Sequence, residues 1–223
     1  MEQTFNQNKS WIYRAVMLLS FNGGFVNAIT FESFFHNPVG YVTGNFTFAA
    51  SYLYDADIVN FVGTVIAVSA FLLGAIISGL IVPHDNFVRN RRYNLALEIE
   101  TAFILIGMLG LIFNIPTSKY WLAIALGLQN GTTTFYGRSI IRTTHMTGTM
   151  TDLGIALAHK IIDSDSIPTW KILIYLYLLL GFFVGSVCGI IAFKQIGYYG
   201  LIFSIIVCII MIRFKVIKLG VKH

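Results

Sequence analysis

Long apolar stretches alternate with short polar connections along the whole chain. Two apolar segments, residues 42–54 and 146–162, are short, and a Thr-Gly pair stands at the start of each. Such lengths are typical of re-entrant or interfacial helices. The other apolar stretches are each about 20 residues long, enough for an α-helix to cross a hydrocarbon core of about 30 Å. These six stretches cover residues 11–31, 58–82, 93–113, 120–140, 170–193 and 198–214. The pattern predicts an all-α polytopic membrane bundle with six crossings and two short helices.

Composition strengthens this interpretation. The 223 residues are 56% hydrophobic and only 11% charged, and the mean hydropathy is +0.74. A water-soluble enzyme with a mixed-charge surface is thereby excluded. Six crossings leave little chain outside the bilayer, so we expect one transmembrane domain over residues 1–223 with the lipid bilayer as its surroundings. The net charge of +5 comes from basic residues scattered through short loops, so nucleic acid is not an expected partner.

The basic residues also predict the topology. With a cytoplasmic N-terminus, six crossings leave only Lys119 and Lys194 outside, out of 15 lysines and arginines. Cytoplasmic loops of membrane proteins are enriched in such residues. Counting the two short segments as full spans would instead place Arg89, Arg91 and Arg92 outside. We therefore expect a multi-pass membrane protein with both termini in the cytoplasm.

The chain also shows a weak internal repeat. A shift of 104 residues aligns seven identical pairs, which supports two halves at residues 11–114 and 118–217. The pairs are Gly23 with Gly127, Thr30 with Thr134, Phe31 with Phe135, Thr43 with Thr147, Gly44 with Gly148, Thr47 with Thr151 and Leu53 with Leu157. Three crossings per half make the second half enter the membrane from the opposite side. Inverted repeats with broken helices are a transporter architecture.

Four short motifs resemble those of the YoaK-like bacterial membrane proteins, a family of unknown function. These motifs are Gly24-Phe25-Val26-Asn27-Ala28, Val42-Thr43-Gly44-Asn45, Leu126-Gly127-Leu128-Gln129-Asn130 and Met146-Thr147-Gly148-Thr149. The resemblance covers nearly the whole chain and implies a multi-span inner-membrane protein. The family usually carries an aspartate where this chain has Asn27. The resemblance supplies no substrate.

Polar residues form a stripe on the first span and another on the fourth. Asn27 and Thr30 share one helical face with Gly23, and Gln129 and Asn130 occupy the matching region of the fourth span. One interpretation is a helix-packing seam, because small residues and amides both favour close helix contacts in membranes. The other is that the two stripes face each other across a polar substrate site.

Each Thr-Gly pair is expected to start a short helix. The threonine oxygen of Thr43 or Thr147 could cap the helix, and Gly44 or Gly148 would leave the backbone open. A helix start inside the bilayer carries unpaired N–H groups that suit a carboxylate or small anion. We therefore include these residues and Asn45 among the expected substrate contacts. The alternative is that both pairs cap helices lying on the membrane surface.

Ionisable residues in apolar segments are candidates for function, because burying a charge in lipid is costly. Glu32 and Asp152 are candidates for proton coupling. Glu98 and Glu100 follow Arg91 and Arg92 closely enough that pairing with them at the inner interface is the simpler interpretation.

No motif for nucleotide, metal or acyl chemistry occurs, so we expect no cofactor, no metal and no catalytic residue. Glycines such as Gly79 and Gly185 are assigned to helix packing, within or between protomers, so a homo-oligomer is possible. The favoured function is a secondary transporter or facilitator of a small polar or anionic solute. The alternatives are a non-catalytic scaffold or sensor subunit, and a membrane-embedded enzyme that would bring Glu32, His145, Asp152 and His159 together.

Overall fold

The computed structural model describes residues 2–33, 38–82, 91–136, 141–164 and 166–213. Within these residues the chain is helical and has no strand, which confirms the predicted all-α membrane bundle. The helices are α1 (Glu2–Glu32), α2 (Val42–Tyr54), α3 (Ile58–Ile81), α4 (Arg91–Ile112), η1 (Pro116–Ser118), α5 (Lys119–Tyr136), α6 (Met146–Ile162), α7 (Thr169–Ile196), η2 (Gly197–Gly200) and α8 (Leu201–Arg213). Several of the basic residues used for the topology, including Arg89 and Arg138, lie outside the described ranges.

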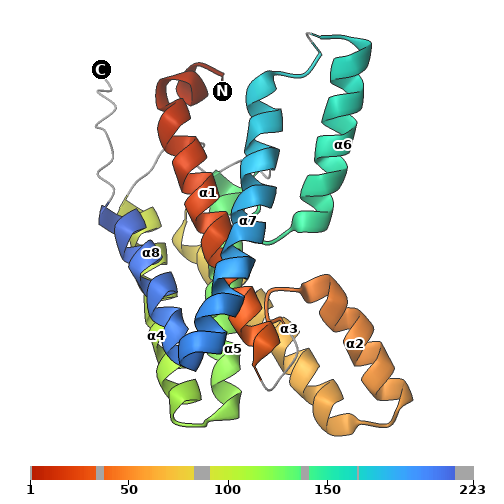
Figure 1. Cartoon of the computed structure of the whole chain (residues 1–223), viewed down its shortest axis with the longest axis vertical. Coiled ribbons are helices and arrows are strands. Elements are labelled where there is room, and N and C mark those ends of the chain that lie inside the picture. The colour runs from red at the N-terminus through yellow and green to blue at the C-terminus, as the bar shows by residue number, and fades with distance from the viewer. Residues whose placement is uncertain (1, 34–37, 83–90, 137–140, 165, 214–223) are drawn as a thin grey trace.

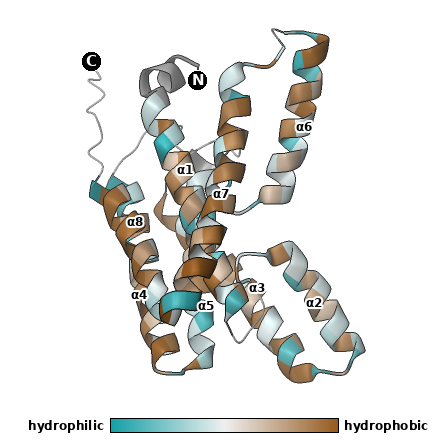
Figure 2. Ribbon diagram, in the orientation of Figure 1, coloured by the Kyte–Doolittle hydropathy of each residue, from teal (hydrophilic) through white to brown (hydrophobic). Residues whose placement is uncertain are grey.

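Four segments of the described chain are long and apolar enough to cross a membrane: Ser10–Glu32, Ile58–Ile81, Arg91–Ile112 and Thr169–Arg213. The last segment contains both α7 and α8, which run in opposite directions (Figure 1). Gly197 makes the reversal between them with φ +60°, a conformation that favours glycine. α5 is absent from the four because its glutamine, asparagine and threonines lower its hydropathy. Hydrophobic residues cover most of α4, α7 and α8 (Figure 2).

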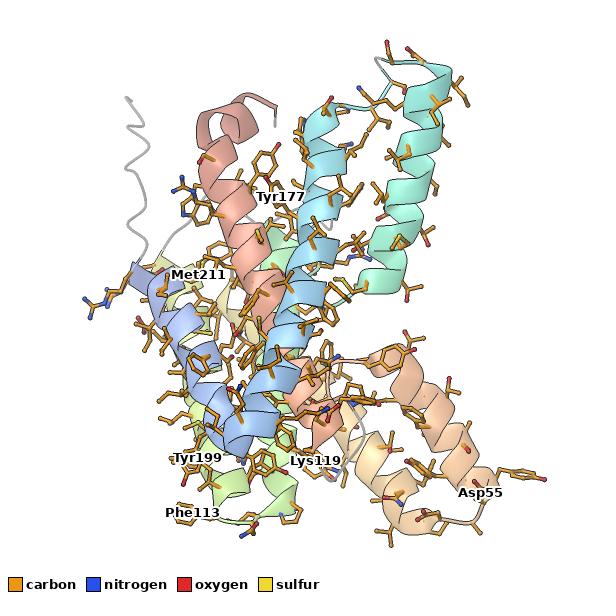
Figure 3. All side chains as sticks on the ribbon, viewed as in Figure 1. Asp55, Phe113, Lys119, Tyr177, Tyr199 and Met211 are labelled. Atoms are coloured by element: carbon orange, nitrogen blue, oxygen red, sulfur yellow. The ribbon has the colours of Figure 1, made fainter. Side chains whose placement is uncertain are left out.

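The long helices run roughly side by side, and the two short helices leave from the middle of the molecule (Figure 1). α2 runs from the centre toward one end, and α6 runs from the centre toward the other end, where the N-terminus lies. α8 runs toward the end at which the N-terminus lies (Figure 1). Lys119, Phe113 and Tyr199 lie at the opposite end (Figure 3). The short helices therefore begin beside the long helices at mid-height and run away from there toward opposite ends (Figure 1).

Glycines bring the long helices into backbone contact. A Cβ atom on Gly24 would overlap the carbonyl oxygen of Phe182, and one on Gly185 would overlap that of Phe21. These two close contacts bring the backbones of α1 and α7 together. The same relation holds for Gly74 with Ile124 and joins α3 to α5. Small residues permit such approaches in membrane bundles. Gly185 packs within the chain as predicted, whereas Gly79 is exposed on the single chain.

The turn between α2 and α3 fixes one end of the first half. The Asp57 carboxylate accepts hydrogen bonds from the Asn60 backbone N–H at 3.1 Å and from its side-chain amide at 2.7 Å. These bonds stabilise the ionised form and hold the pKa of Asp57 below its usual range. Asp57 is thus the N-cap of α3, and its neighbour Ala56 turns the chain with φ +55°.

Candidate functional site

The polar stripe on α1 holds the segment that leads into α2. The Asn27 side-chain oxygen accepts from the Gly40 backbone N–H at 2.9 Å. Thr30 accepts from the Val39 N–H at 3.3 Å and donates to the Asn27 carbonyl at 2.9 Å. These bonds satisfy backbone groups that would otherwise be unpaired in a non-helical segment at membrane depth. They bring the chain back from the end of α1 to the centre of the bundle.

The stripe on α5 does the same for the segment that leads into α6. The Asn130 side-chain oxygen accepts from the Thr144 backbone N–H at 3.4 Å. Gln129 donates to the Thr143 hydroxyl at 2.8 Å. The amides of both stripes therefore anchor the segments that lead into the short helices.

Both short helices start without a side-chain cap. Tyr41 is the N-cap of α2, with φ −92° and ψ 63°, and His145 is the N-cap of α6, with φ −94° and ψ 62°. The expectation that threonine oxygens cap these helices is wrong, because Thr43 and Thr147 lie inside the first turn. In the described structure the first three N–H groups of each helix have no hydrogen-bond acceptor. They remain available to a bound solute.

The two helix starts meet at one cavity of about 370 Å³. Its wall comes from α1, α5, α3, α7 and the two segments that lead into α2 and α6. The lining residues are Asn27, Gly40, Tyr41, Val42, Thr43, Phe71, Asn130, Thr144, His145, Met146, Thr147 and Phe182. In Figure 1 the starts of α2 and α6 lie near the middle of the long helices. The cavity therefore occupies the depth at which the two short helices begin.

The lining consists of equivalent residues from the two halves. Gly24 and Gly127 make the same contact, with the carbonyls of Phe182 and Phe71 respectively. This pairs Phe71 with Phe182. A spacing of 103 residues, the spacing of Gly24 and Gly127, also pairs Asn27 with Asn130. The matched N-caps make Thr43 equivalent to Thr147, 104 residues apart.

All the lining residues fall into six such pairs. The remaining pairs are Gly40 with Thr144, Tyr41 with His145, and Val42 with Met146. A shift of 104 residues aligns the Thr-Gly segments of the two halves correctly. The helices before these segments, α1 and α5, align at a shift of 103 residues instead. There Gly127 corresponds to Gly24, and Gly23 is not its partner. The connection into α6 is therefore one residue longer than the connection into α2.

Charged side chains stand beside the cavity and not in its lining: Arg142 contacts His145, and the Asp152 carboxylate on α6 also acts electrostatically on His145. None of the twelve lining residues is a carboxylate, a lysine or an arginine. The Arg142 guanidinium lies 3.3 Å from the His145 ring nitrogen Nδ1. The two helix starts add the positive ends of their dipoles. Donors thus outnumber charged acceptors at this site.

A family model covers most of the chain. The model for the family described as "Protein of unknown function (DUF1275)" matches residues 15–213. The chain belongs to the DUF1275 family. No curated protein and no solved structure matches this DUF1275 protein. The matched range contains every residue that lines the cavity.

The structure brings together only part of the site expected for this DUF1275 protein. Asn27, Thr43, Asn130 and Thr147 line the cavity. Gly44 and Gly148 do not, because the Tyr41 and His145 rings lie over them at the positions that a Cβ atom would fill. The other expected contacts, Thr30, Asn45 and Gln129, are buried behind the lining.

The expected ionisable residues lie elsewhere. Glu32, at the end of α1, forms an ion pair with Lys194 at 3.9 Å. Asp152 is exposed on α6. Glu100 does not pair with Arg91 or Arg92, as it is buried in the interior and accepts from Asn22. Nine residues of helix separate Glu100 from Arg91, a rise of about 13 Å, which is too long for an ion pair.

The convergence required for a membrane-embedded enzyme is not seen. Glu32 ends α1 at one end of the molecule, while His159 lies on the last turn of α6 at the other end (Figure 1). His145 lies between them at the cavity. Sequence reasoning missed the cavity roles of Tyr41, Phe71 and Phe182. Only Tyr41 carried a signal, since it stands one residue before a short helix.

Proposed function

We propose that this DUF1275 protein is a secondary transporter or facilitator of a small polar or anionic solute. The cavity between the starts of α2 and α6, lined by six equivalent pairs of residues, is the observation that carries the proposal. Solute sites in transporters with inverted repeats lie at the repeat interface near the bilayer midplane, where broken helices begin. The arrangement around Asn27 and Asn130 is of this kind.

Helix packing supports an inverted repeat. α1 packs on α7 and α5 packs on α3, while α2 packs on α3 and α6 packs on α7. α1 also contacts α8 as α5 contacts α4, and α4 contacts α8. Exchanging α1 to α4 with α5 to α8 leaves this set of contacts unchanged. We infer from this pattern a two-fold axis in the membrane plane near the cavity, which would allow alternating access from the two sides.

The anionic class is the favoured solute. The cavity has two uncapped helix starts and no carboxylate in its lining, and Arg142 stands beside His145. Positive ends of half-helices attract anions and repel cations. A small anion could accept from the N–H groups of both helices at once.

We place the protein in the bacterial inner membrane as a YoaK-like member of the family, with both termini in the cytoplasm. α8 runs toward the end of the bundle at which α1 begins (Figure 1), and Lys119 lies at the other end (Figure 3). A phosphatase or green fluorescent protein reporter joined after Val221 tests this orientation. Fluorescence without phosphatase activity is expected, since cytoplasmic loops are rich in lysine and arginine. Active phosphatase at this position would reverse the orientation.

Flux measurements on liposomes containing the purified chain test the function. We expect entry of at least one of chloride, nitrate and formate, with slower entry of urea and glycerol. Thr147→Leu should reduce the faster flux, because leucine fills the cavity at the helix start and removes a polar contact. A lost polar contact costs about 1–3 kcal/mol, which corresponds to roughly 5- to 150-fold.

Thr151→Leu is the matched control, one turn further along α6. Thr151 is exposed, lies outside the lining, and donates only to the Thr147 carbonyl. Its variant should retain wild-type flux. Equal flux in both variants would move the solute path away from the helix starts. A wild-type protein that passes none of the five solutes would favour the scaffold or sensor function.

A further inference from the structure

Glu100 is a fully buried carboxyl group in the middle of α4. Its exposed fraction is 0%. One oxygen, Oε1, accepts from the Asn22 amide at 3.0 Å and from the Cys208 thiol at 3.7 Å. The other oxygen, Oε2, has no hydrogen-bond partner among the described residues. With Gln129 and Ser204, which bind Asn22, these side chains form the Glu100 cluster.

Among the described residues, no cation compensates a charge on Glu100. Cys208 is the only described titratable group that contacts it, and α3 carries no charged residue. The titratable residues of the other packed elements stand near the ends of those elements, and none forms an ion pair or hydrogen bond with Glu100 in the described structure. They are Lys119 and Tyr120 on α5, Tyr198 and Tyr199 on η2, and Arg213 on α8.

Burial without a counter-ion determines the form of the group. An ionised carboxylate in a low-dielectric interior costs several kcal/mol unless a cation or several donors compensate it. Glu100 has one amide donor and one thiol donor, both on the same oxygen. The neutral acid avoids the charge, and Oε2 is free to carry the proton.

The Glu100 cluster touches the wall of the cavity. Asn22 donates to the Gln129 side-chain oxygen at 2.8 Å, and Gln129 donates to the Thr143 hydroxyl at 2.8 Å. The next residues along the chain, Asn130 and Thr144, both line the cavity and are hydrogen-bonded to each other. Any reorientation of the Gln129 amide therefore acts on the segment that positions the start of α6.

Two polar residues of the Glu100 cluster, Asn22 and Gln129, have no polar equivalent in the other half of the chain. At the spacing of 103 residues, Asn22 corresponds to Ala125, and Gln129 corresponds to Val26. The polar network thus exists on one side only, although the cavity lining is paired throughout. Symmetric packing of the halves does not require these residues, so their presence needs another reason.

We propose that Glu100 is a proton-binding site that controls the opening of the cavity at the start of α6. In the closed state the carboxyl group is neutral, with its proton on Oε2. Loss of the proton to cavity water leaves a carboxylate that draws the Asn22 amide more strongly. Asn22 then releases Gln129, and the segment at Thr143 and Thr144 shifts.

Infrared spectroscopy of the full chain in detergent tests the proton. At neutral pH the wild-type protein should show the C=O stretching band of a protonated carboxylic acid. Glu100→Gln should lose this band, because its amide absorbs elsewhere. Glu98→Gln, two residues away on the exposed side of the same helix, should keep it. Absence of the band from the wild-type protein, or its persistence in Glu100→Gln, would overturn the proposal.

Thiol modification tests the link to the cavity without a solute. Thr147→Cys and Thr151→Cys, each combined with Cys188→Ser, are treated with a small thiol reagent while the pH is raised. The ratio of the two rates corrects for thiol ionisation. We expect this ratio to change by roughly threefold or more over the pH range in which the band disappears, as for a shift between two states.

Glu100→Gln should make the ratio independent of pH. A flat ratio in the wild-type background would overturn the control of the cavity, even if the infrared band is present. Neither measurement depends on transport. A protein that passes no tested solute but gives both expected results would refute the transport function and retain the proton site.

Discussion

Replacing Asn27 by aspartate is expected to reduce anion flux by roughly 100-fold. The variant keeps the oxygen that accepts from the Gly40 N–H, so the segment before α2 stays in place. It adds a negative charge to a lining that has none. At an effective dielectric near 20 and a separation of about 5 Å, the repulsion of a bound anion is about 3 kcal/mol. Flux into liposomes measures this loss.

The charge effect has two internal checks. Urea flux should fall by less than about threefold, because a neutral solute feels little of the new charge. The loss should also be smaller at low pH, where the aspartate is protonated. Asn114→Asp is the control, as Asn114 is exposed in the turn after α4 with φ +58°, which aspartate tolerates. Unchanged anion flux in Asn27→Asp would contradict an anionic solute.

Replacing Gly185 by alanine is expected to destabilise the bundle by about 1–3 kcal/mol, the usual cost of overpacking. The new methyl group would overlap the Phe21 carbonyl oxygen, and the Phe21 carbonyl and α carbons would be 2.8 Å away. These are backbone atoms, so only a shift of α7 against α1 relieves the overlap. Thermal or detergent unfolding of the purified protein measures the effect.

Gly154→Ala is the matched comparison. No atom lies within 4 Å of a Cβ atom at Gly154, in the middle of α6. Alanine there should be neutral or should stabilise the helix by up to about 1 kcal/mol. Equal unfolding midpoints for the two variants would show that α1 and α7 are less closely packed than the structure has them.

Hydropathy predicted the long helices well, because crossing a membrane is mainly a requirement on length and composition. The Thr-Gly pairs located the short helices to within a residue, since a glycine-marked helix start is a local feature. The sequence predicted less well which helices pack side by side and which of their residues face one another. Lipid and protein interior are both apolar, so a hydrophobic residue carries little information about which one it faces. Phe71 and Phe182 therefore gave no sign of their place at the cavity.

Glu100 illustrates a second limit. Proximity along the chain suggested a partner among the arginines that precede it, but a helix carries each residue about 1.5 Å further into the membrane. Its actual neighbours, Asn22 and Cys208, are 78 and 108 residues away. Such contacts follow from the packing of α1, α4 and α8, which the pattern of one helix does not specify.

The exchange of packing partners between the halves bears on how the chain is assembled during synthesis. α1 is made first, yet its glycine contact is with α7, which is made near the end. Until then α3 and α5 are able to pair, and Asn22 and Asn27 find partners on α4, on α5 and before α2, but the glycine face of α1 has no helix packed on it. The contact between α1 and α7 therefore closes the molecule, and a chain stopped after α5 would present this glycine face to lipid, where quality-control proteases could recognise it.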